Sequence, residues 1–135
     1  MALETFADIL SRMSDLPGAV VLLSGGQDSA TCLAVALRDV RGVIYALAFD
    51  YGQRHRVELE CAAKLADLAG VPLRVIDLRF IAQLTPNALT DATRDIETKT
   101  GELPSTFVPG RNLFFLSVAA VMARQWGVGK IYTGV

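Results

Sequence analysis

Residues 19–31 read Ala-Val-Val-Leu-Leu-Ser-Gly-Gly-Gln-Asp-Ser-Ala-Thr, and this stretch decides the fold. Its first five residues are apolar and include two valines, which is typical of a strand buried in a parallel sheet. In residues 30–40 the apolar side chains recur at 33, 36, 37 and 40, the spacing of one face of a helix. The sequence therefore predicts a turn at 24–29 that joins a buried strand to a helix.

The predicted turn has the composition of an anion-binding site. The N–H groups at a helix N-terminus lack partners and carry partial positive charge. Gly25 and Gly26 are expected to take positive φ and to let a phosphate approach the backbone closely. Ser24 and Ser29 add hydroxyl donors. Asp28 is expected either to cap the helix or to bind a Mg²⁺ ion that accompanies a nucleotide.

The spacing excludes two common nucleotide-binding loops. A Walker A loop needs a Lys-Ser/Thr pair after its second glycine, and neither that pair nor Gly-x-Gly-x-x-Gly occurs in the turn. The alternative to an anion site is a turn that merely contains two glycines.

The remaining pattern alternates strands with helices, which predicts βαβ units and a parallel sheet. Strands are expected at 43–48, 73–78 and 130–135, and a short amphipathic helix at 6–13 is expected to pack on the sheet edge or on a partner subunit. A helix from about residue 54 is expected to bury Val57, Cys61, Leu65 and Leu68. Another, from about residue 112, is expected to place on one face Leu113, Leu116, Ser117, Ala120 and Val121.

Residues 79–110 break this pattern with many polar side chains, apart from a helical turn expected at 81–84. A loop of this length is expected to act as a lid, the alternative being a disordered insertion. Ligands of open parallel sheets bind beyond the C-terminal ends of the strands. Residues 24–29, 50–56 and 133–135 all lie at the ends of predicted strands, so one site is expected where they converge.

Bulk properties limit the class of protein. A chain of 135 residues is expected to form one domain, and a net charge of −1 provides no broad basic field for nucleic acid. No apolar stretch could span a bilayer and no signal peptide is recognisable, so a cytoplasmic protein is expected. Cys32 and Cys61 fall in separate helical patterns and are expected to be buried small side chains.

Ser-Gly-Gly-x-Asp-Ser after a buried strand resembles the signature of the PP-loop ATP pyrophosphatases. Two further motifs, Asp-Tyr-Gly-Gln-Arg-His at 50–55 and Phe-Val-Pro-Gly-Arg-Asn at 107–112, narrow the comparison. Together the three resemble the 7-cyano-7-deazaguanine synthases of queuosine precursor synthesis, over about residues 19–135. The resemblance implies a doubly wound parallel α/β sheet of the adenine nucleotide alpha-hydrolase type, with strand order 3-2-1-4-5 and the fifth strand missing from this chain.

The same resemblance implies a reaction and its partners. ATP and Mg²⁺ would activate 7-carboxy-7-deazaguanine by adenylation, ammonia would give the amide, and a second activation would give the nitrile. The family carries a zinc-binding cysteine cluster toward its C-terminus; no such cluster occurs here, and the zinc cysteines are expected beyond Val135. The chain is therefore expected to be an incomplete PP-loop ATP-binding domain over 1–135, with neither membrane nor direct nucleic-acid contact and with a homodimer as one arrangement to test.

The resemblance also implies site residues. Asp28 and Arg111 would be catalytic. ATP would be bound by Leu23, Ser24, Gly25, Gly26, Gln27, Asp28, Ser29, Ala30 and Thr31. Contacts to the substrate or the nucleotide would come from Asp50, Tyr51, Arg54, His55, Arg56, Pro109, Gly110, Arg111 and Asn112.

Several of these roles have alternatives. Arg111 would contact phosphate or the substrate carboxylate, or would form a surface salt bridge with the lid. His55 is a general base or a solvent-facing cap, and Asp50 is a Mg²⁺ ligand or a helix N-cap. Tyr51 would stack on the purine-like base or cover the core. At the level of the whole chain, the alternatives are a tRNA thiolase, an amide synthetase and a nucleotide-binding module without catalysis.

Overall fold

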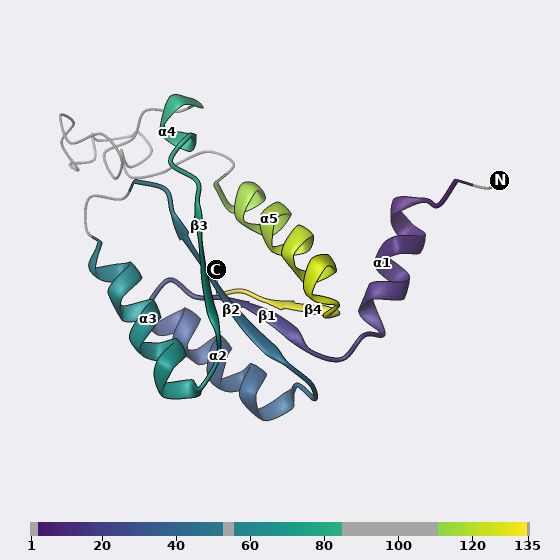
Figure 1. Ribbon diagram of the computed structural model, residues 1–135, viewed down its shortest axis with the longest axis horizontal. Coiled ribbons are helices and arrows are strands. Elements are labelled where there is room, and N and C mark those ends of the chain that lie inside the picture. The colour runs from purple at the N-terminus through teal and green to yellow at the C-terminus, as the bar shows by residue number, and fades with distance from the viewer. Residues whose placement is uncertain (1–2, 53–55, 85–110, 135) are drawn as a thin grey trace, which may run out of the picture.

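The computed structural model describes residues 3–52, 56–84 and 111–134, and these form a parallel α/β sheet with helices on both faces (Figure 1). The strands are β1 (Ala19–Leu22), β2 (Ile44–Asp50), β3 (Leu73–Asp77) and β4 (Lys130–Tyr132). They pair in parallel in the order β3-β2-β1-β4, with Ala19 opposite both Ile44 and Lys130. The predicted class of fold and the order 3-2-1-4 are confirmed.

The last strand is shorter than predicted. The sequence predicts a strand over 130–135, whereas β4 ends at Tyr132 and the next two residues belong to no strand. At Gly134 the backbone lies against Asp28 instead, close enough that an added Cβ would be 2.9 Å from the Asp28 carbonyl carbon. Val135 falls outside the described residues, so the zinc cysteines expected beyond Val135 stay a prediction.

Helices α2 (Gln27–Asp39) and α3 (Val57–Ala69) cover one face of the sheet, and α5 (Arg111–Trp126) covers the other. Side chains alternate between the two faces along each strand. On β2, the small Ala46 and Ala48 pack in the cluster that contains α2 and α3. The larger Leu47 and Phe49 point to the opposite side, toward α5. The short helix α4 (Ile81–Leu84) forms at the predicted helical turn.

The face predicted for α5 is wrong, and the face predicted for α3 is wrong in part, since Leu65 packs against the core while Val57 and Leu68 are exposed. On α3 the residues that are buried are Ala62 and Ala66, while Leu68 is 85% exposed. On α5 the predicted face points to solvent, since Leu113 is 70% exposed. The opposite face packs on the sheet through Phe114, Phe115, Val118, Ala119, Met122, Ala123 and Trp126.

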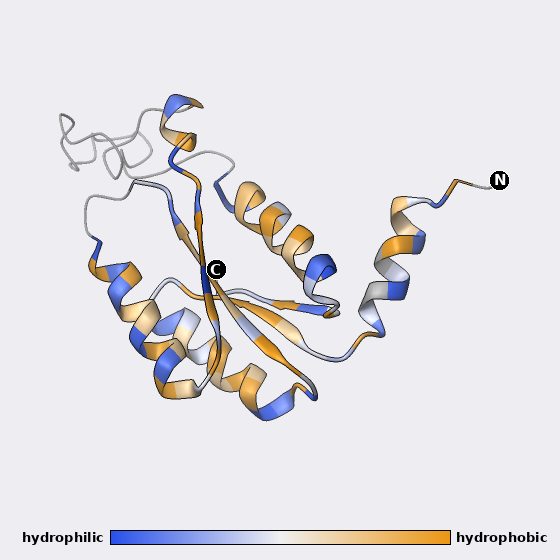
Figure 2. Cartoon of the chain, viewed as in Figure 1, coloured by the Kyte–Doolittle hydropathy of each residue, from blue (hydrophilic) through white to orange (hydrophobic). Residues whose placement is uncertain are grey.

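Aromatic stacking explains which face of α5 is buried. Trp126 stacks on Tyr45 with ring centroids 4.5 Å apart, and Phe115 stacks on Phe49 at 4.3 Å. Aromatic side chains bury the largest apolar areas, and stacked pairs add to that gain. Figure 2 shows hydrophobic residues along much of α5, so apolar spacing alone could not identify its buried side.

Helix α1 (Phe6–Ser14) occupies nearly the predicted range and begins with a reciprocal cap. The Asp8 N–H donates to Thr5 Oγ1 at 3.1 Å, and the Thr5 N–H donates to Asp8 Oδ2 at 3.2 Å. The helix extends away from the sheet in Figure 1, and Phe6 is 74% exposed. The predicted packing on the sheet edge is therefore wrong, while packing on a partner subunit stays a prediction. Within the described ranges, no helix is long and apolar enough to cross a membrane.

Candidate functional site

The segment at 24–29, called the loop below, comprises the turn after β1 and the first three residues of α2, and its own hydroxyls hold it in shape. Ser29 Oγ accepts from the Ser24 N–H at 3.1 Å and donates to the Gly26 carbonyl at 3.0 Å. Ser24 Oγ donates to Ser29 Oγ at 3.2 Å and accepts from the Gly26 N–H at 3.3 Å. The sequence predicts the two serines as donors to an anion, whereas here they brace the loop.

The first turn of α2 is available to an anion. Its N-cap is Gly26, and no side chain in the described part of the chain caps the helix, so the first N–H groups keep the unpaired character of a helix N-terminus. The capping role predicted for Asp28 is therefore wrong. Asp28 is exposed at the second helical position, where a Mg²⁺ ligand stays a prediction.

The two glycines of the loop differ. Gly25 has φ +84°, and a Cβ there would lie 2.6 Å from the Glu58 carbonyl oxygen and 2.8 Å from Cys61 Cβ. Gly26 has φ −83°, and among the described residues its Cβ would meet only Ser24 Oγ, at 3.5 Å. The positive φ predicted for Gly26 is wrong, because only Gly25 turns the chain against α3.

Asp28, near the C-terminal end of the loop, contacts Gly134, the second residue after β4. A Cβ at Gly134 would lie 2.9 Å from Asp28 Cβ and 3.0 Å from the Asp28 carbonyl oxygen. The loop is thus held between α3 and the end of β4, so two of the three predicted strand-end segments, 24–29 and the described part of 133–135, lie together.

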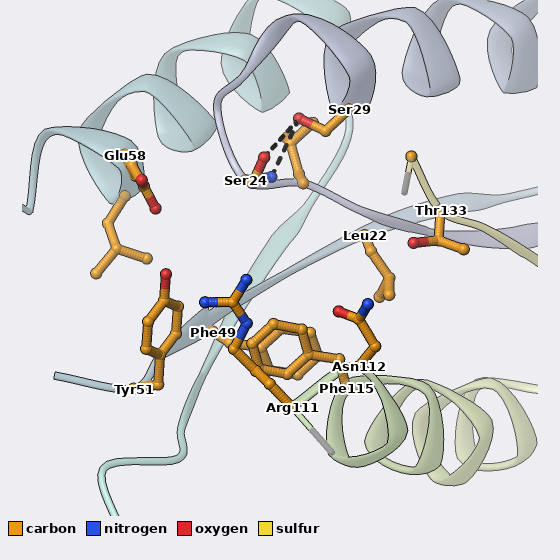
Figure 3. Close-up of a pocket in the computed structure, with 13 residues that line it drawn as sticks. Leu22, Ser24, Ser29, Phe49, Tyr51, Glu58, Arg111, Asn112, Phe115 and Thr133 are labelled. Atoms are coloured by element: carbon orange, nitrogen blue, oxygen red, sulfur yellow. Dashed lines mark hydrogen bonds between the residues drawn. The ribbon is translucent and has the colours of Figure 1, made fainter. Parts of the chain in front are cut away.

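A pocket of about 290 Å³ opens where these segments meet, between the loop, the end of β2 and the start of α5 (Figure 3). It contains six of the predicted site residues: Leu23, Ser24, Ser29, Tyr51, Arg111 and Asn112. Those that lie elsewhere are Gly25, Gly26, Gln27, Asp28, Ala30, Thr31, Asp50 and Arg56. Four more fall outside the described residues, namely Arg54, His55, Pro109 and Gly110.

Arg111 points its guanidinium into this pocket from the first residue of α5 (Figure 3). The guanidinium carbon lies 5.3 Å from the ring centroid of Tyr51 and 5.8 Å from that of Phe115. Its Nη1 atom is buried and has no hydrogen-bond partner among the described residues. A buried donor without a partner is costly, and a guanidinium matches a carboxylate or phosphate well. This position favours the ligand contact over the surface salt bridge.

Tyr51 serves both the core and the pocket. Its side chain is buried in the core cluster under α5, as one of the two predicted alternatives requires, and its ring also lines the pocket. Burial raises the pKa of the Tyr51 hydroxyl, and the Glu58 carboxylate raises it further, while Arg111 lowers it. The hydroxyl therefore stays protonated at neutral pH.

Asp50, at the end of β2, supports the local backbone. Its Oδ1 accepts from the Gly52 N–H at 3.1 Å, and its Oδ2 accepts from Arg56 Nη2 at 3.0 Å. The N-cap of α3 is Arg56, so the capping role predicted for Asp50 is wrong. The Mg²⁺-ligand role of Asp50 stays a prediction; this carboxylate is already paired with Arg56, which does not line the pocket.

Seven pocket residues are not among the predicted site residues: Leu22, Phe49, Glu58, Leu59, Phe115, Thr133 and Gly134. Glu58 is the charged one, and it lies in the first turn of α3. A helix that starts beyond the C-terminal end of a strand places its first turn at the ligand-binding edge, and this signal could have found Glu58. Within the described ranges, no three His, Cys, Asp or Glu side chains are grouped to hold a metal.

Comparisons with known proteins agree with this geometry. The family model described as "Queuosine biosynthesis protein QueC" matches residues 18–135. The structure of an NH3-dependent NAD synthetase from Campylobacter jejuni superposes with a TM-score of 0.59 at 18% identity, covering 93% of this chain and 55% of that one. An NMN synthetase from Francisella tularensis gives 0.57 at 19% identity, covering 90% and 50%. The chain thus spans about half the length of these two structures, which share the PP-loop adenine nucleotide alpha-hydrolase fold.

Proposed function

The chain belongs to the QueC family of queuosine biosynthesis proteins, and from that premise we propose that it forms the ATP-binding domain of a 7-cyano-7-deazaguanine synthase. In the proposed reaction, a carboxylate oxygen of 7-carboxy-7-deazaguanine attacks the α-phosphorus of ATP and pyrophosphate leaves. Ammonia then displaces AMP from the acyl carbon to give the amide. The amide oxygen attacks the α-phosphorus of a second ATP, pyrophosphate leaves, and the amide nitrogen loses one proton. The nitrogen then loses its second proton as the C–O bond breaks, so AMP leaves and the nitrile remains.

The single observation that carries this proposal is the buried Arg111 Nη1 without a partner among the described residues, in a pocket beside the loop at 24–29. A guanidinium there would bind the substrate carboxylate and offset the negative charge that builds up during adenylation. The uncapped N–H groups of α2 would hold the phosphates.

ATP and Mg²⁺ fit the residues on this side of the sheet. Mg²⁺ commonly uses one or two carboxylates together with substrate phosphates, so the exposed Asp28 beside the phosphate-binding turn is the ligand that we propose. When bound, Mg²⁺ would neutralise phosphate charge. The pocket volume of about 290 Å³ suits a base-sized substrate rather than a whole nucleotide, so the phosphates would lie over the loop.

Product analysis tests the proposal. The protein is incubated with 7-carboxy-7-deazaguanine, ATP and ammonium, and the nitrile, AMP and pyrophosphate are measured by mass spectrometry and chromatography. Where the protein is active, we expect two molecules of AMP for each molecule of nitrile. We also expect the chain itself to bind ATP measurably. Arg111→Ala should lower kcat/KM by about 100-fold, as expected for loss of a charged contact to the transition state.

Arg124→Ala is the matched control, since Arg124 is an exposed arginine near the other end of the same helix. It should leave kcat/KM unchanged. ADP and orthophosphate as the sole products would contradict PP-loop chemistry. Transfer of sulfur to tRNA, or amidation of another acid with no reaction of 7-carboxy-7-deazaguanine, would replace the proposed substrate.

A further inference from the structure

The pocket contains two opposite charges that are not paired with each other. Glu58 enters from α3 and Arg111 from α5. The ion pairs formed among the described residues include neither of them. Figure 3 shows the Glu58 carboxylate on the same side of the pocket as the Tyr51 hydroxyl, across from Asn112 and Thr133. The pocket therefore has an acidic side that the proposed anionic ligands do not explain.

A carboxylate in this place works against the binding of anions. ATP and a carboxylate substrate are both negative, and a like charge nearby disfavours each of them. The helix dipole stabilises an acidic residue in the first turn of a helix. Glu60 lies in the same first turn as Glu58 and gains the same stabilisation, yet Glu60 does not line the pocket. The dipole therefore does not explain why a carboxylate lies in the pocket. The location of Glu58 in the pocket calls for a ligand group that donates hydrogen bonds.

We infer that Glu58 determines substrate specificity by accepting hydrogen bonds from the two adjacent N–H donors of an amino-pyrimidinone ring, while Arg111 binds the acid group of the same molecule. This inference rests on the proposed function and deepens it. An ionised carboxylate has two acceptor oxygens, and it matches a ring N–H beside an exocyclic amine in the same way that Asp and Glu accept from base edges in nucleic acids.

The shape and polarity of the pocket support this assignment. A volume of about 290 Å³ lies near the lower limit of ligand pockets and suits a single bicyclic base. The aromatic side chains Phe49, Tyr51 and Phe115 provide an apolar wall, and the Arg111 guanidinium lies over the rings of Tyr51 and Phe115. Glu58 itself is exposed at the rim of the fold, so it can meet a ligand without a change in the core.

The decisive experiment compares two ligands and three proteins. Dissociation constants are measured by titration calorimetry for 7-carboxy-7-deazaguanine and for its analogue that lacks the exocyclic amine. The proteins are the wild-type chain, Glu58→Gln and the control Glu60→Gln, which removes an exposed charge from the same helical turn. Urea midpoints for the three proteins establish that their stabilities match.

In the wild type, removal of the amine should weaken binding by about 10-fold or more, the size expected for a paired base-edge contact. Glu58→Gln should weaken binding of the substrate by a similar factor and should bind both ligands nearly alike, because the contact is then already lost. Glu60→Gln should behave as the wild type does.

Three results would overturn the inference alone. In the first, Glu58→Gln binds the substrate as the wild type does. In the second, it still discriminates against the analogue by the full factor. In the third, it raises the KM for ammonium without changing the affinity for the heterocycle, which would make Glu58 an ammonium-binding residue instead. A wild-type chain that binds neither ligand would overturn the proposed function together with this inference.

Discussion

Gly25 and Gly26 are adjacent, but a substitution at Gly25 should lower stability, whereas one at Gly26 should leave stability nearly unchanged and abolish ATP binding. Gly25 has φ +84°, where a residue with a Cβ loses about 1–2 kcal/mol. The added carbon would also lie 2.6 Å from the Glu58 carbonyl oxygen, a backbone atom that must move. Such overpacking typically costs about 1–3 kcal/mol. We therefore expect Gly25→Ala to lower the free energy of unfolding by about 2–5 kcal/mol.

Gly26→Val should leave stability nearly unchanged. At φ −83° and ψ 171° a β-branched residue is unstrained, and its Cβ would meet only Ser24 Oγ at the ordinary distance of 3.5 Å. Glycine is a better N-cap than valine, so we allow less than about 1 kcal/mol of loss. The branched side chain would nevertheless stand where a phosphate must approach the backbone, so binding of ATP should be lost.

Urea denaturation followed by circular dichroism gives the unfolding free energies, provided that the m-values agree, and titration calorimetry gives the affinity for ATP. The reasoning about the loop would be refuted by a Gly25→Ala chain as stable as the wild type. It would be refuted equally by a Gly26→Val chain that binds ATP with wild-type affinity.

Two pKa shifts give further predictions. Hydrogen bonds from Arg79 lower the pKa of Asp77 from 3.8 to about 2. The ionised carboxylate therefore stabilises the folded state at pH values above its unfolded pKa, and this stabilisation is lost as the pH falls from about 4 to 2. Urea midpoints over that range should therefore fall less steeply in Arg79→Ala than in the wild type, and parallel curves would contradict the pairing. Burial raises the pKa of the Tyr51 hydroxyl in the folded protein above 10.0. The protonated hydroxyl therefore contributes stability below pH 10, and this stability is lost as the pH rises through the pKa of the folded state. The difference in absorbance at 295 nm between wild type and Tyr51→Phe should show a tyrosine that ionises later than free tyrosine, and ionisation at pH 10 or below would contradict the burial.

The order of strands and helices could be predicted from the sequence because each signal is local. The apolar run of β1, the glycines after it and the later strand-helix alternation predict a parallel sheet without knowledge of distant contacts. The same signals place Ser24, Ser29 and Tyr51 at one edge of the sheet, whereas Arg111 is predicted from the family resemblance, and the pocket contains all four.

The orientations of α3 and α5 could not be predicted, because they depend on partners far away in the sequence. Both helices carry apolar residues on more than one side. The aromatic rings of β2 select the side of α5 that bears Phe115 and Trp126, and the small residues of β2 allow Ala62 and Ala66 to approach. Glu58 is a different case, because the first turn of a helix that starts beyond the end of β2 lies at the ligand-binding edge, and sequence reasoning considered only the strand ends themselves.

Phe115 contributes both to the stability of the fold and to the shape of the pocket, so the two cannot change independently at this position. One side of its ring stacks on Phe49 within the core, and the residue also lines the pocket. Phe115 is half-buried, and replacement of a fully buried phenylalanine by a small residue costs about 3–5 kcal/mol, so that range is the upper limit for this position and still a large part of the stability of a typical domain. A lineage that reshaped the pocket at Phe115 for a larger ligand would first need compensating substitutions elsewhere, whereas Glu58 and Asn112, at exposed positions, can vary with little structural penalty. New specificities in this architecture should therefore arise first at the rim of the pocket and only later at its floor.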